Sequence, residues 1–263
     1  MSDVFLTRRG GTVASMPKFT YTGDYELIDD GNHNWRIKFL TSGDFTLLNE
    51  IGAIDVFLVG GGASGNSGAY GSGGGGGGGY TATHKNVVIN RKQAYPIVVG
   101  AGANATSGNR SNSNAGGESS AFSFKAAGGK SGRPNDLNGG GTNGGSGGGN
   151  NGAGGSDGNN GSGSVGTLAK GQRNTAGPNG ESGTTREFGE PTGDLYAGGG
   201  GGAGSAGGAG GGGTGSTTDA AIGKGKPNTG GGGAGSTHTT GDYGGTGARS
   251  GGSGIVIIRN ARS

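Results

Sequence analysis

The stretch GGGGGAGSAGGAGGGG, residues 198–213, belongs to a tract from Gly128 to Gly254 that decides the fold. The chain has 75 glycines among 263 residues, and in this tract glycine repeatedly falls on every third position, as in Gly152, Gly155, Gly158 and Gly161. An earlier tract that begins at Gly62 keeps the same spacing. A period of three is typical of the left-handed polyproline-II conformation, which glycine adopts without proline.

Two other structures share this composition. Flexible linkers and disordered tails are rich in glycine, and collagen has the same period. The residues between the glycines are mainly Ala, Ser, Asn and Thr, with very little proline, which disfavours both a solvated tail and a triple helix. Because glycine lets extended chains approach closely enough for backbone hydrogen bonds, we expect a packed bundle of polyglycine-II helices.

Strand patterns flank the glycine-rich tract. Apolar and polar residues alternate through Trp35–Phe39 and Phe45–Leu47, as in strands with one buried face. Ile54–Val59 and Ile255–Ile258 are almost continuously apolar, as in central strands covered on both sides. Glycine-rich excursions leave from strand ends and return to strand starts, so the sequence predicts one antiparallel β-sandwich with the glycine helices projecting from one side. Three further strands are predicted over residues 80–89, 95–100 and 119–126.

The fold class expected is therefore all-β, an antiparallel β-sandwich with a projecting polyglycine-II helix bundle. Residues 1–20 are predicted to be an N-terminal arm. The sandwich is predicted to comprise residues 21–127 and 255–263, with glycine excursions at 60–79 and 100–118. Residues 128–254 are predicted to form the bundle, interrupted by islands of larger residues.

Composition excludes several classes of protein. The chain has no cysteine, so it has neither disulfides nor thiolate metal sites, and it has no apolar run of the roughly 18 residues that a membrane span needs. The start, MSDVFLTRRGG, does not resemble a signal peptide. The formal charge is only +3, and no basic cluster interleaves with aromatic residues, so neither membrane insertion nor nucleic-acid binding is expected.

Catalytic and metal chemistry is not expected either. His33, His84 and His238 share no metal-ligand spacing, and no grouping of nucleophile and base stands out. The pattern G-x-G-x-x-G occurs many times, but in such a composition it carries no information about nucleotides. The sequence therefore predicts a protein that is not an enzyme and that holds no cofactor and no metal.

Four stretches carry a resemblance to a known class of proteins: IDVFLVGGG (54–62), GGGGGGYTAT (74–83), YPIVVGAGA (95–103) and GGSGIVIIRN (251–260). They resemble the glycine-rich domains of bacteriophage and prophage tail-fibre proteins, and the start of the chain is similar to starts of such proteins. More distantly, the glycine helices resemble those of the tail-fibre tip adhesins of T-even-like phages, whose polyglycine-II bundle presents receptor-binding loops. A related sandwich occurs in an animal receptor tyrosine kinase ectodomain.

This resemblance implies a virion tail protein that recognises a host cell-surface receptor, either a glycan or a surface protein. It also implies contacts with other phage tail proteins through the N-terminal arm, and a possible homotrimer. Aromatic and cationic residues in the islands are the receptor-binding candidates, because binding surfaces are enriched in Tyr and Arg. They are Arg133, Arg173, Arg186, Phe188, Tyr196, Lys224, Lys226, His238 and Tyr243.

Three alternatives remain open at this stage. Phe188, Leu195 and Tyr196 could instead pack as a small apolar cluster. The chain could be a structural spacer or assembly component of a phage tail, without receptor recognition of its own. Finally, it could be an ice-binding protein, since period-three glycine bundles also serve that function, although charged islands do not suit the flat face of small residues that ice binding needs.

Overall fold

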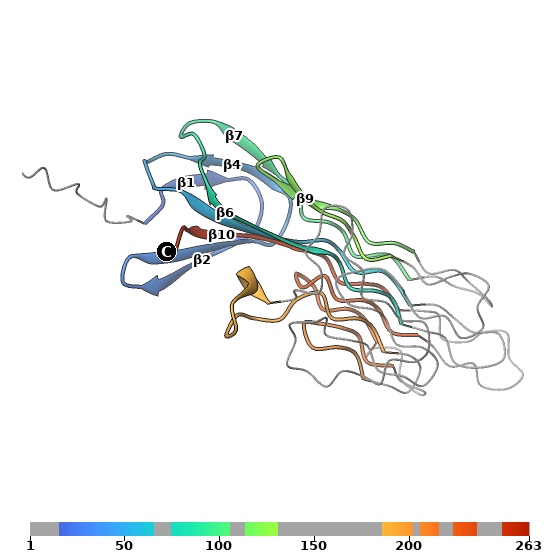
Figure 1. Ribbon diagram of the computed structural model, residues 1–263. Helices are drawn as coiled ribbons and strands as arrows, with labels where there is room; N and C mark the ends of the chain where they lie inside the picture. Colours follow the sequence, from blue (N-terminus) through green and yellow to red (C-terminus); the bar gives the residue numbers. More distant parts are fainter. Residues whose placement is uncertain are drawn as a thin grey trace, which may run out of the picture.

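The computed structural model describes residues 16–65, 75–105, 114–130, 186–201, 206–215, 223–235 and 249–262. Two antiparallel sheets pack face to face, and glycine-rich segments run side by side away from one end of this sandwich (Figure 1). The predicted all-β, antiparallel sandwich is thereby confirmed. No helix within the described ranges is long and apolar enough to cross a membrane.

The larger sheet has the strand order β2-β3-β10-β5-β6. The last strand of the chain, β10, lies between β3 and β5, and it pairs Ile257 with both Lys38 and Phe57. The C-terminal apolar run is therefore central to this sheet, as its composition predicts. The five strands are β2 (Tyr25–Gly31), β3 (Asn34–Phe39), β5 (Ile54–Val59), β6 (Thr81–Val87) and β10 (Ile255–Asn260).

The smaller sheet has the order β1-β4-β7, and a short hairpin, β8-β9, lies beside it. The hairpin is joined to the segment after β7 by an antiparallel bridge between Val98 and Ser120. The strands are β1 (Phe19–Tyr21), β4 (Gly43–Leu47), β7 (Ala94–Ile97), β8 (Ser119–Ala121) and β9 (Phe124–Ala126).

The two central strands of the larger sheet, β5 and β10, are buried on both faces. One face packs against the smaller sheet in a core that includes Trp35, Phe39 and Phe45. On the opposite face, Phe57 and Ile257 lie in a second cluster, which also includes side chains from residues 188–197. All six residues of β5 are buried, which confirms the prediction of a central strand covered on both sides.

Two local features differ from the sequence prediction. Residues 119–126 form a hairpin rather than one strand, because Phe122 and Ser123 both take left-handed backbone angles, with φ of 51° and 72°, and so reverse the chain. In addition, Phe19 and Thr20, predicted as the end of the arm, belong to β1 and pair with Leu47 and Thr46.

Residues 60–65 continue directly from β5 and show how the glycine-rich segments are joined. Their successive backbone N–H groups donate to three neighbouring segments in turn, with N···O distances of 2.9–3.0 Å, and the direction repeats every third residue. Gly60 and Ala63 donate to residues 77–80, Gly61 and Ser64 to residues 114–117, and Gly62 and Gly65 to residues 249–252. The carbonyl oxygens of Gly61, Gly62 and Ala63 accept from three other segments, through Gly129, Ala103 and Gly233.

Residues 230–235 repeat this arrangement. Gly232 and Gly235 donate to Gly198 and Gly201, over 2.9 and 3.0 Å. On another side of the same segment, the carbonyl oxygens of Gly231 and Ala234 accept from residues 249–252. In both segments, the backbone therefore forms a hydrogen bond with the same neighbouring segment at every third residue, which is the period seen in the sequence.

Close approach of the backbones explains why these positions are glycine. A Cβ atom placed on Gly62 would lie 2.0 Å from the carbonyl oxygen of Gly231, and one on Gly61 would lie 2.1 Å from that of Ala101. Atoms do not approach this closely without a bond, so a side chain at either position would force the segments apart.

The described turns between glycine segments lie next to the sandwich. In the turn over residues 209–211, Gly210 lies against the backbone of Tyr196, and in the turn over 227–230, Gly230 lies against the side chain of Val59. Residues 223–226 alternate buried glycines with the exposed side chains of Lys224 and Lys226.

Candidate functional site

Residues 186–196, the covering segment, lie against the face of the larger sheet that the smaller sheet leaves open. The segment doubles back on itself: Arg186 pairs with Leu195 in an antiparallel bridge, and the N–H of Glu187 donates to the carbonyl of Asp194 over 2.9 Å. A 3₁₀ turn, η1 (Glu187–Gly189), occupies the bend. Gly193 closes the loop beside it, where a Cβ would lie 2.7 Å from the carbonyl oxygen of Glu187.

Aromatic packing fixes this segment to the sheet. Phe188 and Tyr196 are 3% and 5% exposed, and their ring centroids lie 5.7 and 5.5 Å from that of Phe57 in β5. Both residues were predicted as receptor-binding candidates exposed on a loop. That expectation is wrong for these side chains, because both are buried in the second cluster. Their burial agrees with the alternative that they pack in an apolar cluster.

A buried ion pair lies beside these rings. Arg259 in β10 and Asp55 in β5 are opposite one another in the sheet, and the Nε of Arg259 donates to Oδ2 of Asp55 over 3.1 Å. The guanidinium carbon of Arg259 is 4.0 Å from the ring centroid of Phe188, and its Nη1 donates to Oε1 of Glu190 over 2.5 Å. One side chain thus links two strands to the covering segment through charge and ring contacts.

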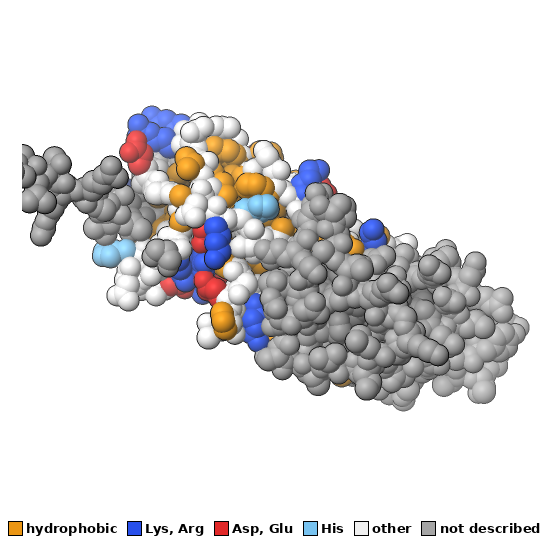
Figure 2. All heavy atoms as spheres, viewed as in Figure 1, with side chains coloured by type: hydrophobic (Ala, Val, Ile, Leu, Met, Phe, Trp, Pro, Cys, Tyr) orange, Lys and Arg blue, Asp and Glu red, His pale blue; other side chains and the backbone are white. Residues whose placement is uncertain are grey.

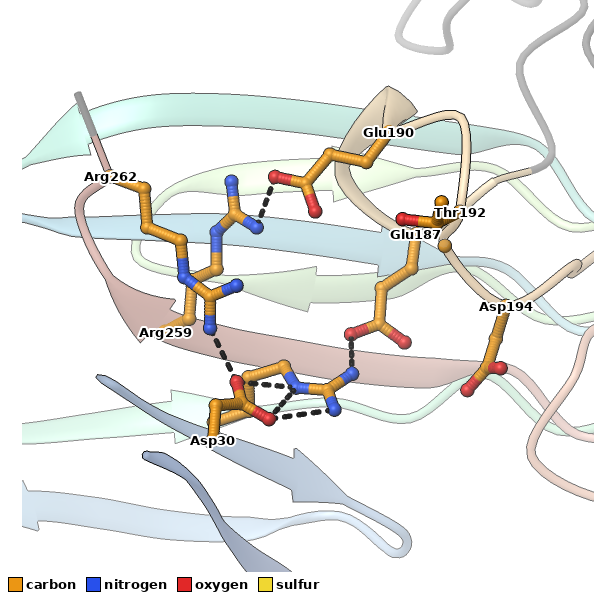
Figure 3. A pocket seen from close by; sticks show the side chains of 9 residues that line it. Asp30, Glu187, Glu190, Thr192, Asp194, Arg259 and Arg262 are labelled. Carbon is orange, nitrogen blue, oxygen red and sulfur yellow. Dashed lines mark hydrogen bonds and ion pairs between the residues drawn. The ribbon is translucent and has the colours of Figure 1, made fainter. Parts of the chain in front are cut away.

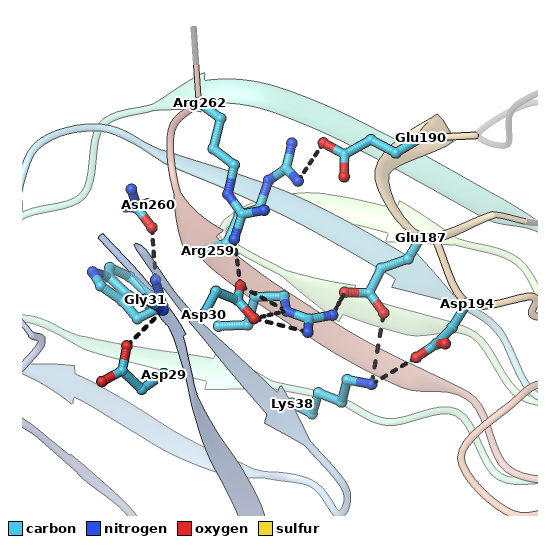
Figure 4. A network of polar contacts seen from close by, with 12 residues as sticks. Asp29, Asp30, Gly31, Lys38, Glu187, Glu190, Asp194, Arg259, Asn260 and Arg262 are labelled. Atoms are coloured by element: carbon cyan, nitrogen blue, oxygen red, sulfur yellow. Dashed lines mark hydrogen bonds and ion pairs between the residues drawn. The ribbon is translucent and has the colours of Figure 1, made fainter. Parts of the chain in front are cut away.

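A second group of ion pairs joins β2 and β3 to the same segment (Figure 4). Arg36 donates from Nε and Nη2 to the carboxylate oxygens of Asp30, over 2.9–3.1 Å. Its Nη1 donates to Oε1 of Glu187 over 2.6 Å. The other oxygen of Glu187 accepts from the hydroxyl of Tyr196 over 3.1 Å and lies 3.6 Å from Nζ of Lys38. The carboxylate of Glu187, almost fully buried, is therefore compensated on both oxygens.

These contacts shift the acid–base equilibria of the groups that make them. Burial on its own raises the pKa of Asp30, but hydrogen bonds from Arg36 and Arg262 outweigh it and hold that pKa below its usual value. Burial on its own lowers the pKa of Arg36, and its bonds to Asp30 and Glu187 raise it instead. Burial, followed by the negative charge of Glu187, raises the pKa of the Tyr196 hydroxyl. These shifts favour an ionised Asp30, a protonated Arg36 and a neutral Tyr196 hydroxyl.

The charged side chains surround a pocket of about 230 Å³ (Figure 3). This is smaller than the ~300–1,000 Å³ of a usual small-molecule site. Three of its four acids, Asp30, Glu187 and Glu190, each bond an arginine of the pocket, and the fourth, Asp194, pairs with Lys38 over 3.3 Å. Within the described residues, no group of His, Asp and Glu side chains is arranged to hold a metal ion. The arrangement is suited to fastening the covering segment to the sheet.

Acid should weaken this fastening. Because the pKa of Asp30 is lowered by folding, its contribution to stability is fully present above the unfolded value, about 3.8, and is lost as the pH falls through the folded pKa. We expect the melting temperature to fall below about pH 4, and to fall less in Asp30→Asn. The matched control is Asp29→Asn, since Asp29 only accepts the N–H of Gly31 over 2.8 Å. Equal acid sensitivity of Asp30→Asn and the parent would contradict this assignment.

Three of the remaining predicted site residues, Arg186, Lys224 and Lys226, lie in the described part of the chain. Arg186, partly buried, donates from Nη1 to the carbonyl of Gly193 over 3.0 Å, and so shapes the covering segment. Lys224 and Lys226 are exposed on the flank of the bundle. The other candidates, Arg133, Arg173, His238 and Tyr243, lie outside the described residues.

Sequence reasoning missed the ionic network. Its signal was a charged residue inside each of two apolar runs, Asp55 in IDVFLV and Arg259 in IVIIRN. Lone charges in central strands require partners when they are buried, so the two could have been matched with one another. Nothing in the local sequence indicated Glu187, because its partners Arg36 and Lys38 are about 150 residues away in the chain.

Comparison with known proteins agrees with the glycine-rich character of the chain. Residues 40–261, the greater part of it, match the family model described as a glycine-rich domain. No curated protein matches the sequence. The matched range begins directly after β3 and ends directly after β10, so it spans the glycine segments together with most of the strands that anchor them.

Proposed function

We propose that this chain, which belongs to the glycine-rich domain family, is a bacteriophage tail-fibre or tail-tip protein that recognises a host cell surface. The observation that carries the proposal is the way the glycine segments are joined: by backbone hydrogen bonds, at separations that leave no room for side chains. A scaffold held together in this manner keeps its shape while the stretches that connect its segments vary. Variable connections on a constant scaffold are the usual basis of recognition.

We also propose that the segments are polyglycine-II helices. Two observations support this conformation. The N–H groups of residues 60–65 turn to the same neighbour at every third residue, and this segment has hydrogen-bonded neighbours both on its donor sides and on its acceptor sides. A β-strand directs its N–H groups to two sides only, in alternation, so it would not produce this pattern.

Candidate receptor contacts come from the connecting stretches. In sequence, residues 236–248 join a segment that leaves the sandwich to one that returns, and they include His238 and Tyr243. Residues 131–185 include Arg133 and Arg173. Lys224 and Lys226 are the candidates left exposed in the described part of the bundle. Within the same proposal, the N-terminal arm that precedes β1 contacts other tail proteins, the receptor is a glycan or a surface protein, and a homotrimer is the assembly to test.

Two measurements test this function. Labelled full-length protein is incubated with a panel of Gram-positive and Gram-negative cells, and antibodies to the chain are applied to phage particles released from induced lysogens. We expect saturable binding to some strains, competed by unlabelled protein, and labelling of particle tails. Tyr243→Ser should reduce cell binding without a change in melting temperature.

Other outcomes favour other functions. Tail labelling without binding to any strain would favour the structural spacer, and absence of both would overturn the tail assignment. Thermal hysteresis at micromolar protein concentration, without cell binding, would favour the ice-binding alternative.

A further inference from the structure

A groove opens on the side of the sandwich away from the covering segment. Its walls are the residues that follow β6, the strand β7 and the hairpin β8-β9, and its volume is about 430 Å³. Figure 2 shows hydrophobic side chains at the surface in the region that β6, β7 and β9 occupy in Figure 1. Val88, which lines the groove, is 82% exposed. Unlike the charged pocket, this groove falls within the ~300–1,000 Å³ of small-molecule sites.

The lining combines aromatic rings with polar groups that are neutral except for Lys125, and that residue is paired with Glu118 over 2.8 Å. Tyr95 and Phe122 contact each other with centroids 5.1 Å apart, and Phe124 stacks on His84 at 3.8 Å. The hydroxyl of Tyr95 accepts the N–H of Asn90 over 2.8 Å, which leaves its own hydrogen to be donated elsewhere. Gln93, Ser120 and Ser123 add amide and hydroxyl groups to the walls.

The hairpin holds an aromatic ring at the groove in an unfavourable backbone conformation. Phe122 has φ of 51° and Ser123 has φ of 72°, in a two-residue turn for which Asn and Gly are strongly preferred. A bulky residue in the left-handed region is strained, and such strain clusters at active sites and ligand-binding sites. Here the strained residue places its ring between those of Tyr95 and Phe45.

An added β-strand does not fit this groove well. The backbone of Asp44 faces β1, where its oxygen accepts from Thr22 N over 3.3 Å and its N–H donates to Thr22 Oγ1 over 2.8 Å. Asp44 is therefore not hydrogen-bonded to Pro96, its partner in β7, and the alternation of the ladder turns the backbone of Pro96 toward the groove. Proline has no N–H to offer there, which blunts the edge against strand pairing.

We propose that this groove binds one or two pyranose rings of a cell-surface glycan. A pyranose ring has an apolar C–H face that stacks on aromatic rings and hydroxyl groups that bond neutral polar side chains, and the groove supplies both. The inference rests on the proposed function for the source of the glycan, but it places this contact on the sandwich instead of the connecting stretches of the bundle.

Saturation-transfer NMR on the full chain tests the groove with three soluble probes: methyl α-glucopyranoside, methyl β-galactopyranoside and methyl N-acetyl-β-glucosaminide. We expect transfer to the C–H protons of at least one probe. Phe122→Asn removes the ring, and the preference of Asn for the left-handed turn offsets part of the packing lost against Phe45. The variant should therefore still fold, which its melting temperature checks, and should bind that probe about three- to tenfold more weakly. Tyr95→Phe, which removes only the hydroxyl, should weaken binding as well.

The matched control is Leu48→Asn, which replaces a 45% exposed apolar residue outside the groove and should leave the transfer unchanged. Transfer to none of the three probes would overturn the inference. Transfer that survives both Phe122→Asn and Tyr95→Phe would overturn it too, because the sugar would then lie elsewhere.

The two proposals fail separately. Saturable binding to cells without transfer to any probe would remove the groove and leave the proposed function standing. Transfer that depends on Phe122, without cell binding and without antibody labelling of phage particles, would support the groove as a sugar site and overturn the proposal of a tail protein.

Discussion

Gly62→Ala should lower the free energy of unfolding by about 3–5 kcal/mol, although it adds only one methyl group. The added carbon would lie 2.0 Å from the carbonyl oxygen of Gly231, in a region where both neighbours are backbone and no flexible side chain can move aside. Separation of the segments would break the hydrogen bonds that Gly62 makes to Gly252 and Ala103. Chemical denaturation followed by circular dichroism measures the loss.

The matched control is the same substitution at Gly52. A Cβ there meets nothing within 4 Å, and Gly52 lies in an exposed loop before β5. Gly52→Ala should be neutral or stabilise by up to about 1 kcal/mol, because it restricts the unfolded chain. Similar stability of the two variants would mean that the segments are not packed as closely as described.

Arg259→Met should cost about 3–5 kcal/mol, because it leaves the carboxylate of Asp55 buried without a cation. Asp55 is 1% exposed and would keep only the N–H of Asn86, over 3.1 Å, as a partner. Methionine preserves most of the volume of the arginine stem, so the loss reports the charge more than the packing. The free energy of unfolding at neutral pH is the quantity to compare.

The double variant Arg259→Met with Asp55→Asn separates these effects. Asparagine can still accept the N–H of Asn86 but carries no charge, so the double variant should recover part of the stability lost in the single one. Losses that simply add would show that the ion pair contributes nothing beyond the packing of its two members.

How far the sequence predicts this structure depends on the range of the interactions involved. The apolar runs in β5 and β10 and the period of three in glycine each reflect a repeating local environment, so the sandwich and the joined glycine segments follow from them. Residues 186–196 interrupt that period, and their place on the sheet depends on Arg36, Phe57 and Arg259, which are distant in sequence. For that reason the sequence leaves open whether Phe188 and Tyr196 are exposed for binding or pack in an apolar cluster.

The hairpin β8-β9 illustrates another limit. SSAFSF has no glycine, asparagine or proline to mark a turn, and its alternation fits a single strand. The reversal at Phe122 and Ser123 is imposed by tertiary packing, since Phe122 joins the core between the sheets.

The rotation of hydrogen-bond direction along residues 60–65 limits how such a chain can change length. Adding or removing one or two residues would turn every later N–H toward the wrong neighbour, whereas a change of three restores each bond. A lengthened outgoing segment also needs a returning segment of matching length beside it. At the level of the gene, we expect insertions and deletions within the bundle to be multiples of three codons, with a matching change in the outgoing and the returning segment. The stretches that connect the segments are not subject to this constraint.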